Sequence, residues 1–339
     1  MLLTQDEIKN ACRWLLKNSG PSIRYRTLTE IMHKPYDDSD VQAAYAEILS
    51  SNRFKYISAK QNTDGSFGEK SFHGHDTSES YIRELFELGV NPEHVMLKKG
   101  VEYVENLCVS QKDISTWIVG LLTEPIGRAG KNQLVLDWLT DYTEKFINLY
   151  NYHRKDWLIT KRGNPSTYYL EIPYIYVIRT LSYSWWWLKE AADWEVVSKI
   201  LEFLLVDMAE VDKLYWIAPN NPKVSYPNFL HIVTSDSISM SIPSVYDFVI
   251  SLEGLWLLAE FGIIEKYPNL LNCFKFVSSK KNNDGLWEFP VQGVTKSKSM
   301  WHAYHGFSLE EDWRRKEAPI AELTFRICLT AEKNRNGKA

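Results

Sequence analysis

Residues 56–67 read YISAKQNTDGSF, and residues 276–287 read FVSSKKNNDGLW. Both segments begin with an aromatic and a β-branched residue, pass through Gln or Lys and then Asn, and reach Asp-Gly. Each ends on an aromatic residue two positions after the glycine. Asp-Gly favours a chain reversal, because glycine adopts positive φ without strain. The sequence therefore predicts two copies of one turn, in which the last aromatic side chain folds back onto the helix before it.

Helix signals dominate the rest of the chain. Thr4 with Glu7 and Ser39 with Gln42 match the capping box that opens a helix. Glycines at 89 and 262 stand where helices should end. Strands are expected only as short pieces near 215–217 and 231–234. We expect a first helix from residue 4 to residue 20 and further helices over 21–32, 41–49, 76–88, 92–107, 131–149, 171–190, 194–209, 246–262, 267–281 and 317–333.

Composition points to one globular unit. Of 339 residues, 45% are hydrophobic and 24% are charged, which suits a soluble protein with a large core. A net charge of −4 provides no basic field, so we do not expect nucleic acid as a partner. There is no signal peptide, no apolar stretch long enough to span a membrane and no flexible linker. We expect a cytoplasmic protein with a single domain over residues 1–339, and the sequence leaves its oligomeric state open.

Aromatic residues are numerous, with 13 Trp, 19 Tyr and 14 Phe. They form either a large aromatic core or a cavity walled by rings, which would suit a carbocation, a sugar or a flat apolar ligand. The four cysteines are scattered singly, without the close pairs used in zinc or redox sites.

The two turn segments resemble the QW repeat of squalene-hopene and oxidosqualene cyclases, in the terpenoid cyclase and protein prenyltransferase superfamily. The first copy has Phe67 where Trp is usual, and the second keeps Trp287 but has Lys281 in the Gln position. The stretch 14–27 also resembles small bacterial proteins described as cyclase-like. This resemblance implies an all-α fold, an α/α toroid built as a barrel of helical hairpins, with long loops at one end.

The resemblance also implies where chemistry would lie. In that superfamily, the residues after such a turn begin an inner helix whose N-terminus faces a central cavity. Class II terpene cyclases place their DxDD motif there, and protein prenyltransferases place a zinc-binding Asp-x-Cys. Here only Asp76-Thr77 matches the end of DxDD, and Ser78 stands in the Cys position. His75 and Asp76 are therefore acid–base candidates, whereas Asp76 with Glu79 alternatively forms a capping box.

Three more acids lie in apolar surroundings on the expected inner helices, namely Glu171 at a helix start and Asp247 and Glu253 in one apolar run. Such acids either have a raised pKa useful in catalysis or pair with an arginine such as Arg179. The predicted catalytic residues are thus His75, Asp76, Glu171 and Asp247.

Aromatic and histidine residues near the expected cavity are predicted to bind substrate. His302 and His305 would share a helix face and could bind a metal, or could form hydrogen bonds with Glu310 or Asp312. We predict no metal and no cofactor. The predicted substrate-binding residues are Tyr169, Trp287, Trp301 and His302.

Three functions fit these features. The first is a terpenoid cyclase-like enzyme that acts on an isoprenoid or other apolar small molecule in an aromatic-lined cavity by acid–base catalysis. The second is a carbohydrate-active toroid hydrolase or lyase, which needs two acids about 5–10 Å apart. The third is a non-catalytic binding or scaffold toroid. A deep apolar cavity with one acid would favour the first, a polar groove with paired acids the second and a filled centre the third.

Overall fold

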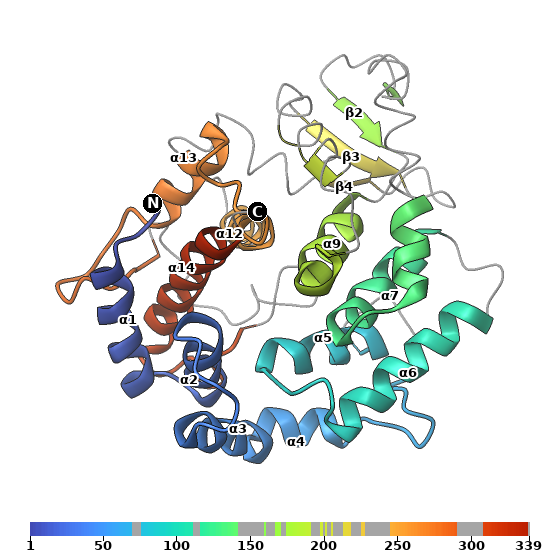
Figure 1. Cartoon of the computed structure of the whole chain (residues 1–339), viewed down its shortest axis with the longest axis horizontal. Coiled ribbons are helices and arrows are strands. Elements are labelled where there is room, and N and C mark those ends of the chain that lie inside the picture. Colours follow the sequence, from blue (N-terminus) through green and yellow to red (C-terminus); the bar gives the residue numbers. More distant parts are fainter. Residues whose placement is uncertain are drawn as a thin grey trace.

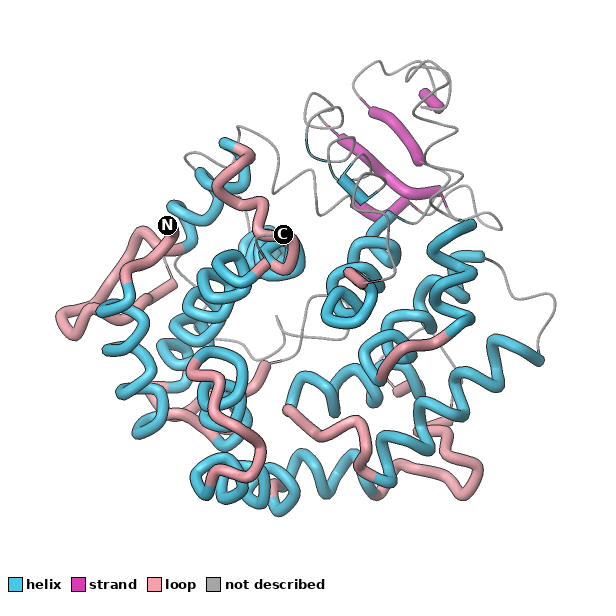
Figure 2. Tube along the Cα trace, viewed as in Figure 1, coloured by secondary structure: helices cyan, strands magenta, loops and turns pink. Residues whose placement is uncertain are grey.

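The protein is built mainly of α-helices, with one small sheet at the edge of the molecule (Figures 1 and 2). The computed structural model describes residues 1–69, 76–110, 116–141, 159–160, 167–170, 174–190, 197–198, 201, 205, 213–217, 225–227, 245–289 and 308–337. Its helices are α1 (Gln5–Asn18), α2 (Pro21–Arg26), the π-helix η1 (Thr27–Ile31), α3 (Ser39–Ser50), α4 (Asn52–Ser58), α5 (Ser78–Leu88), α6 (Val95–Ser110), α7 (Thr116–Ala129), α9 (Tyr174–Leu188), α12 (Val245–Ala259), α13 (Pro268–Val277) and α14 (Ala318–Asn336), and residues 133–141 are also helical.

Within the described chain, α2, α5, α7, α9, α12 and α14 contact one another in an order that returns to its start. Each of these helices contacts the next, and α14 contacts α2. Helices α5 and α14 are buried on nearly all sides, as expected for helices enclosed by others. We refer to these six helices as the inner helices.

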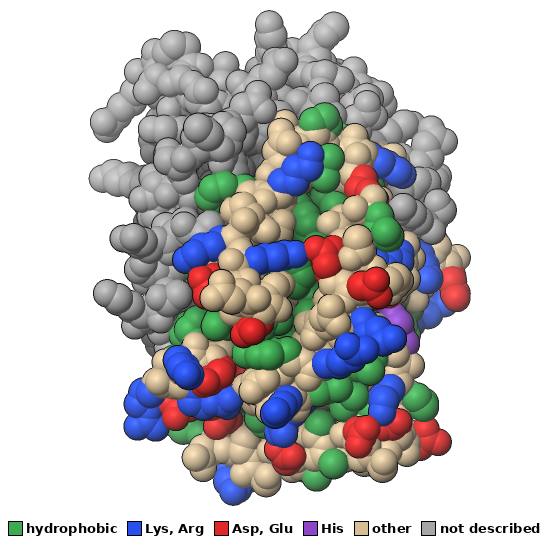
Figure 3. All heavy atoms as spheres, turned by 90° about the vertical axis from the view of Figure 1, so that its left-hand side faces the viewer, with side chains coloured by type: hydrophobic (Ala, Val, Ile, Leu, Met, Phe, Trp, Pro, Cys, Tyr) green, Lys and Arg blue, Asp and Glu red, His purple; other side chains and the backbone are tan. Residues whose placement is uncertain are grey.

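Helices α1, α3, α4, α6 and α13 cover the inner helices from outside. Each buries one face only, as Ile8, Cys12 and Leu15 do in α1. Helix α1 packs against α14, α3 against α2, α6 against α5 and α7, and α13 against α12. On the face that carries α1 and α13, acidic and basic side chains are interspersed (Figure 3). Over the residues that the structure describes, no helix is long and apolar enough to cross a membrane.

The two predicted turns are confirmed and have the same geometry. Gly65 and Gly285 adopt positive φ of 93° and 76°. Phe67 and Trp287, the aromatic residues that close the turns, are completely buried. Isolated β-bridges tie each of them back to the residue at the Gln or Lys position. The last aromatic side chain therefore packs inward on the helix that it follows, as the sequence predicts.

Each turn is fixed to the next inner helix through a hydroxyl group. The backbone N–H of Phe67 donates to Ser78 Oγ of α5 at 2.9 Å, and that of Trp287 donates to Thr324 Oγ1 of α14 at 3.2 Å. The Ser78 hydroxyl thus supports the turn. Because both donors are buried, these bonds also satisfy backbone groups that would otherwise be unpaired.

Each turn also reaches the neighbouring outer helix. The Gln61 side chain donates to the carbonyl oxygen of Met96 in α6 at 2.8 Å. The Lys281 ammonium lies 4.6 Å from the centre of the Trp287 ring and pairs with Glu7 of α1 at 2.6 Å. Lys281 in the second copy therefore contacts a neighbouring outer helix, as Gln61 does in the first. Through Glu7, it connects the turn after α13 to α1.

The predicted helix ends are partly right. The capping box of Thr4 and Glu7 is present, and the glycines at 89 and 262 have positive φ at helix ends. The box predicted at Ser39 and Gln42 is wrong, because Asp38 caps α3 and its carboxylate accepts the first backbone N–H groups. The sequence also gave no helix over 116–129, where α7 contains Pro125. Because proline in a helix interior removes a backbone hydrogen bond, the sequence of this segment favours a helix break.

The sheet has the strand order β1-β2-β3-β4. Strands β2 and β3 are parallel, and the other two pairs are antiparallel. The strand expected near 215–217 belongs to β3, whereas 231–234 lies outside the described residues. The helical class is thus confirmed for the body of the protein, to which the sheet is an addition. The strands are β1 (Ile159–Thr160), β2 (Thr167–Leu170), β3 (Lys213–Ile217) and β4 (Ser225–Pro227).

Candidate functional site

The residues predicted to carry function fall into three groups in the structure. His75, Glu171, Trp301 and His302 lie outside the described residues. Asp247 lies in α12 and Tyr169 in β2, at positions where the structure describes the backbone alone. Asp76 and Trp287 have described side chains, and each lies beside a different one of the two turns.

Asp76 stands just before α5 and contacts the first turn. Its carboxylate accepts a hydrogen bond from the Tyr81 hydroxyl at 2.6 Å. A Cβ on Gly68 would lie 2.9 Å from the same carboxylate, so turn and carboxylate are closely packed. The alternative capping role is wrong, because Thr77 is the N-cap of α5 and makes no side-chain capping bond. Asp76 therefore packs with Tyr81 and the turn.

Trp287 closes the second turn and is completely buried. Its ring lies under the Lys281 ammonium, and its backbone is bonded to α14. A side chain without exposed area offers no surface to a substrate, so in this structure Trp287 is part of the core. The Trp185–Trp187 run divides as helical geometry requires, with the first and third rings buried and Trp186 59% exposed.

Sequence reasoning missed most of a set of charged residues on the inner helices, which we call the charged belt. They lie on α2, η1, α5, α7, α9, α12 and α14, and most are nearly inaccessible to solvent. Arginines and glutamates are equal in number, so the belt is neutral as a whole when all are ionised. The belt consists of Arg26, Glu30, Arg83, Glu87, Glu124, Arg128, Arg179, Glu253, Glu322 and Arg326.

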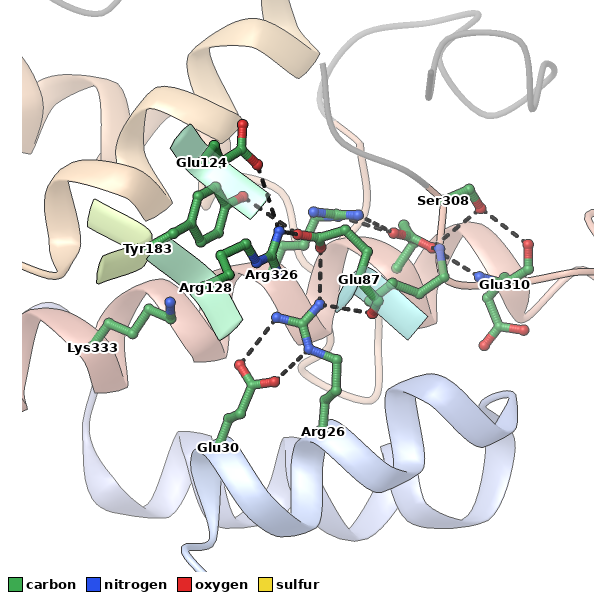
Figure 4. Close-up of polar contacts among 12 residues, drawn as sticks. Arg26, Glu30, Glu87, Glu124, Arg128, Tyr183, Ser308, Glu310, Arg326 and Lys333 are labelled. Atoms are coloured by element: carbon green, nitrogen blue, oxygen red, sulfur yellow. Dashed lines mark hydrogen bonds and ion pairs between the residues drawn. The ribbon is translucent and has the colours of Figure 1, made fainter. Parts of the chain in front are cut away.

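Glu87 joins four helices within the belt (Figure 4). One carboxylate oxygen accepts from Arg26 of α2 at 3.0 Å. The other accepts from Arg128 of α7 at 3.0 Å and from the Tyr183 hydroxyl of α9 at 3.3 Å. Burial alone would raise the pKa of Glu87, but the surrounding guanidinium groups hold it well below its ordinary value. Glu87 is therefore an ionised structural connector at neutral pH.

The belt continues around the inner helices in pairs. Arg83 of α5 donates to Glu124 of α7 at 2.9 Å. Arg179 of α9 donates to Glu253 of α12 at 2.8 Å, as the sequence had suggested for Arg179 with a buried acid. Within α14, Glu322 pairs with Arg326. A buried charge is tolerated when it has such a partner, so the belt explains how so many charges lie inside this protein.

Arg26 and Arg326 of the belt also contact aromatic rings on neighbouring helices. The Arg326 guanidinium lies 4.4 Å from the ring centre of Trp256 in α12, and that of Arg26 lies 5.2 Å from Phe325 in α14. Both distances are within the range of cation–π attraction. The described inner helices thus meet through buried ion pairs and cation–π contacts.

A cavity opens where several inner helices end, and we call it the helix-end pocket. Its larger part has a volume of about 630 Å³ and its smaller part about 200 Å³. Glu30, Trp186, Glu260 and Lys333 line both parts. These side chains come from the last turn of η1, α9 and α14 and from the residue after α12, so the ends of four helices meet here.

Lys333 interacts with two carboxylates of the helix-end pocket. Its ammonium pairs with Glu260. Burial works to raise the pKa of Glu30, but the charge and hydrogen bonds of Arg26, with the charge of Lys333, lower it. The pocket therefore presents the ionised Glu30 and the Glu260–Lys333 ion pair beside an exposed indole. Among the described residues, no group of three or more His, Cys, Asp or Glu is placed to hold a metal ion.

Comparison with known protein families, with curated proteins and with solved structures finds no match to this chain. The function of this chain is therefore inferred from the geometry of its own residues.

One sequence pattern could have predicted part of the charged belt. Oppositely charged residues four apart stand inside apolar helical segments, as at Arg83 and Glu87, Glu124 and Arg128, and Glu322 and Arg326. Such pairs are common on solvated helix faces, where they contribute little. Apolar residues on both sides of the pair distinguish the buried case.

Proposed function

We propose that this chain is an α/α toroid, a ring of helical hairpins with an inner and an outer layer. The closed order of contacts among the inner helices supports this architecture. So does the ion pair of Lys281 with Glu7, because it joins the last outer helix in the sequence to the first. The two turns that resemble QW repeats lie at equivalent places in this arrangement, each between an outer helix and the next inner one.

We further propose that the toroid binds a small polar molecule in the helix-end pocket. The observation that carries this proposal is the meeting of two carboxylates, Glu30 and Glu260, with Lys333 and the exposed Trp186 around one cavity. A cavity of about 630 Å³ is large enough for a drug-sized ligand. Its convergent polar groups can orient such a ligand by hydrogen bonds.

The pocket favours binding over acid catalysis. A general acid needs a pKa near the working pH, and that of Glu30 is lowered instead. The charge of the Glu260 carboxylate is balanced by the Lys333 ammonium, with which it forms an ion pair. The proposed function is therefore that of a ligand-binding toroid, the third of the functions considered from the sequence.

Isothermal titration calorimetry with choline, spermidine, glucose and glucuronate tests this function. We expect saturable binding of at least one of them, with Kd below about 1 mM, equivalent to about 4 kcal/mol. Glu260→Gln should weaken that binding, and Glu93→Gln should not, since Glu93 is a surface partner of Lys98 with 81% of its side chain exposed. Absence of binding to all four molecules overturns the proposal.

A terpenoid cyclase-like activity on an isoprenoid is the second proposal, favoured by the two turns. It would use His75, Asp76, Glu171 and Asp247, which precede or begin inner helices in the sequence. Incubation of the protein with farnesyl diphosphate and squalene, followed by mass spectrometry of the products, tests it. Cyclised products that disappear in His75→Ala would support it, and unchanged substrates would refute it.

A further inference from the structure

We propose that the helix-end pocket selects an organic cation, whose ammonium group takes the position of the Lys333 ammonium beside Glu260. This inference rests on the proposed binding function and names its ligand class. It depends on the helix ends, on the side-chain charges, on the exposed indole and on the mobility expected of a lysine side chain.

The helix ends contribute negative potential. η1, α9, α12 and α14 end at the pocket, which receives side chains from their last turns or the residues just after them. Backbone carbonyl groups at a helix C-terminus lack intrahelical partners and carry about half a negative charge. Cations are stabilised at such ends and anions are not.

Charged side chains of both signs line the pocket. The larger part of the pocket is lined by the carboxylates Glu30, Glu190 and Glu260, by the ammonium groups Lys189 and Lys333, and by His33. Arg26 pairs with both Glu30 and Glu87, and Arg128 pairs with Glu87. Glu260 pairs with Lys333, so displacement of Lys333 leaves this carboxylate to a bound cation.

Trp186 gives the pocket an aromatic surface suited to a cation. It lines both parts of the cavity with 59% of its surface exposed, in contrast to the buried Trp185 and Trp187. Indole rings attract ammonium groups more strongly than other aromatic side chains do. Aromatic rings bind quaternary ammonium groups through this attraction.

The ammonium group of Lys333 lies in this environment. Its ammonium pairs with Glu260 and is close enough to Glu30 to act on its charge. The side chain is 18% exposed and has a flexible four-carbon stem. A ligand ammonium can therefore displace it from the carboxylates without a change in the backbone. This predicts an unusual sign: loss of Lys333 should strengthen binding of a cation.

The test is calorimetric titration of choline and of its neutral isostere 3,3-dimethylbutan-1-ol, which differs by carbon in place of nitrogen. We expect choline to bind at least about tenfold more tightly, the ratio that corresponds to about 1.4 kcal/mol. Lys333→Met should strengthen choline binding about threefold or more, and Glu260→Gln should weaken it about tenfold. Lys98→Met is the matched control and should change neither, because Lys98 is 58% exposed on the surface.

The outcomes separate this inference from the proposed function. If the two isosteres bind equally, or Lys333→Met weakens choline binding, the cation inference is wrong. If glucose or glucuronate then binds in a manner sensitive to Glu260→Gln, the binding function stands without it. If neither these molecules nor spermidine binds, both proposals fall.

Discussion

Glu310 is a buried acid whose replacement by glutamine should stabilise the protein at alkaline pH. Its carboxylate accepts the backbone N–H of Gly20 at the start of α2 at 2.7 Å, and its exposed fraction is 2%. Burial raises the pKa of Glu310 from an ordinary 4.5 to about 7, and the nearby charge of Glu322 adds to this. The Gly20 hydrogen bond and Arg315 oppose the rise without cancelling it.

The sign of the effect follows from linkage. With a raised pKa, the folded protein keeps the Glu310 proton to higher pH than the unfolded chain does. The contribution of Glu310 to the free energy of unfolding therefore falls as pH rises from about 4.5 to about 7 and is constant above that. At 1.36 kcal/mol per pKa unit, the change from 4.5 to about 7 corresponds to about 3 kcal/mol at most.

Glu310→Gln removes the charge and keeps an amide oxygen that can accept the Gly20 N–H. The variant should equal the wild type at pH 4 and exceed it by up to about 3 kcal/mol at pH 8, measured by urea denaturation followed by tryptophan fluorescence. Glu93→Gln, on the surface, should show no such pH-dependent difference. The reasoning is refuted if the Glu310 variant is no more stable than the wild type at pH 8, or if the difference is the same at both pH values.

Three further predictions concern the turns and the charged belt. Gly285→Ala should cost about 1–2 kcal/mol, because alanine is strained at positive φ but a Cβ there meets no atom within 4 Å. Gly65→Ala should cost more, since its Cβ would lie 2.5 Å from the carbonyl oxygen of Lys99; equal losses in denaturation experiments would contradict the packing argument. Glu87→Gln should cost about 3–5 kcal/mol by the same assay, because two guanidinium groups lose a buried anionic partner, and a loss below about 1 kcal/mol would show that the belt is solvated.

The features predicted well from the sequence depend on local chemistry. Asp-Gly turns, the Thr4 capping box and the glycine ends of helices each need only a few adjacent residues, and all of them are present in the structure. The two turns are also alike in their contacts, because the backbone N–H groups of Phe67 and Trp287 both bond to a hydroxyl group on the next inner helix. Local rules failed at α7, where packing against α6 and α9 holds a helix despite Pro125.

The site was harder to predict because it depends on which helix faces meet. Acids such as Asp76 were chosen by their position after a turn, and the structure places Asp76 against Tyr81. The helix-end pocket is assembled from residues as distant as Glu30 and Lys333, and neither belongs to a motif. Nothing in the order of residues states that the ends of η1, α9, α12 and α14 converge, so their shared cavity follows only from the tertiary structure.

Hydrogen–deuterium exchange with and without saturating choline tests the central claim most directly, because it locates the ligand. If the helix-end pocket binds it, amide protection should increase in peptides covering the ends of α9, α12 and α14, over residues 182–190, 257–262 and 329–337. Peptides covering the turn and start of α5, over residues 64–82, should not change. Protection confined to residues 64–82 would contradict the pocket as the binding site and would favour the cyclase-like proposal.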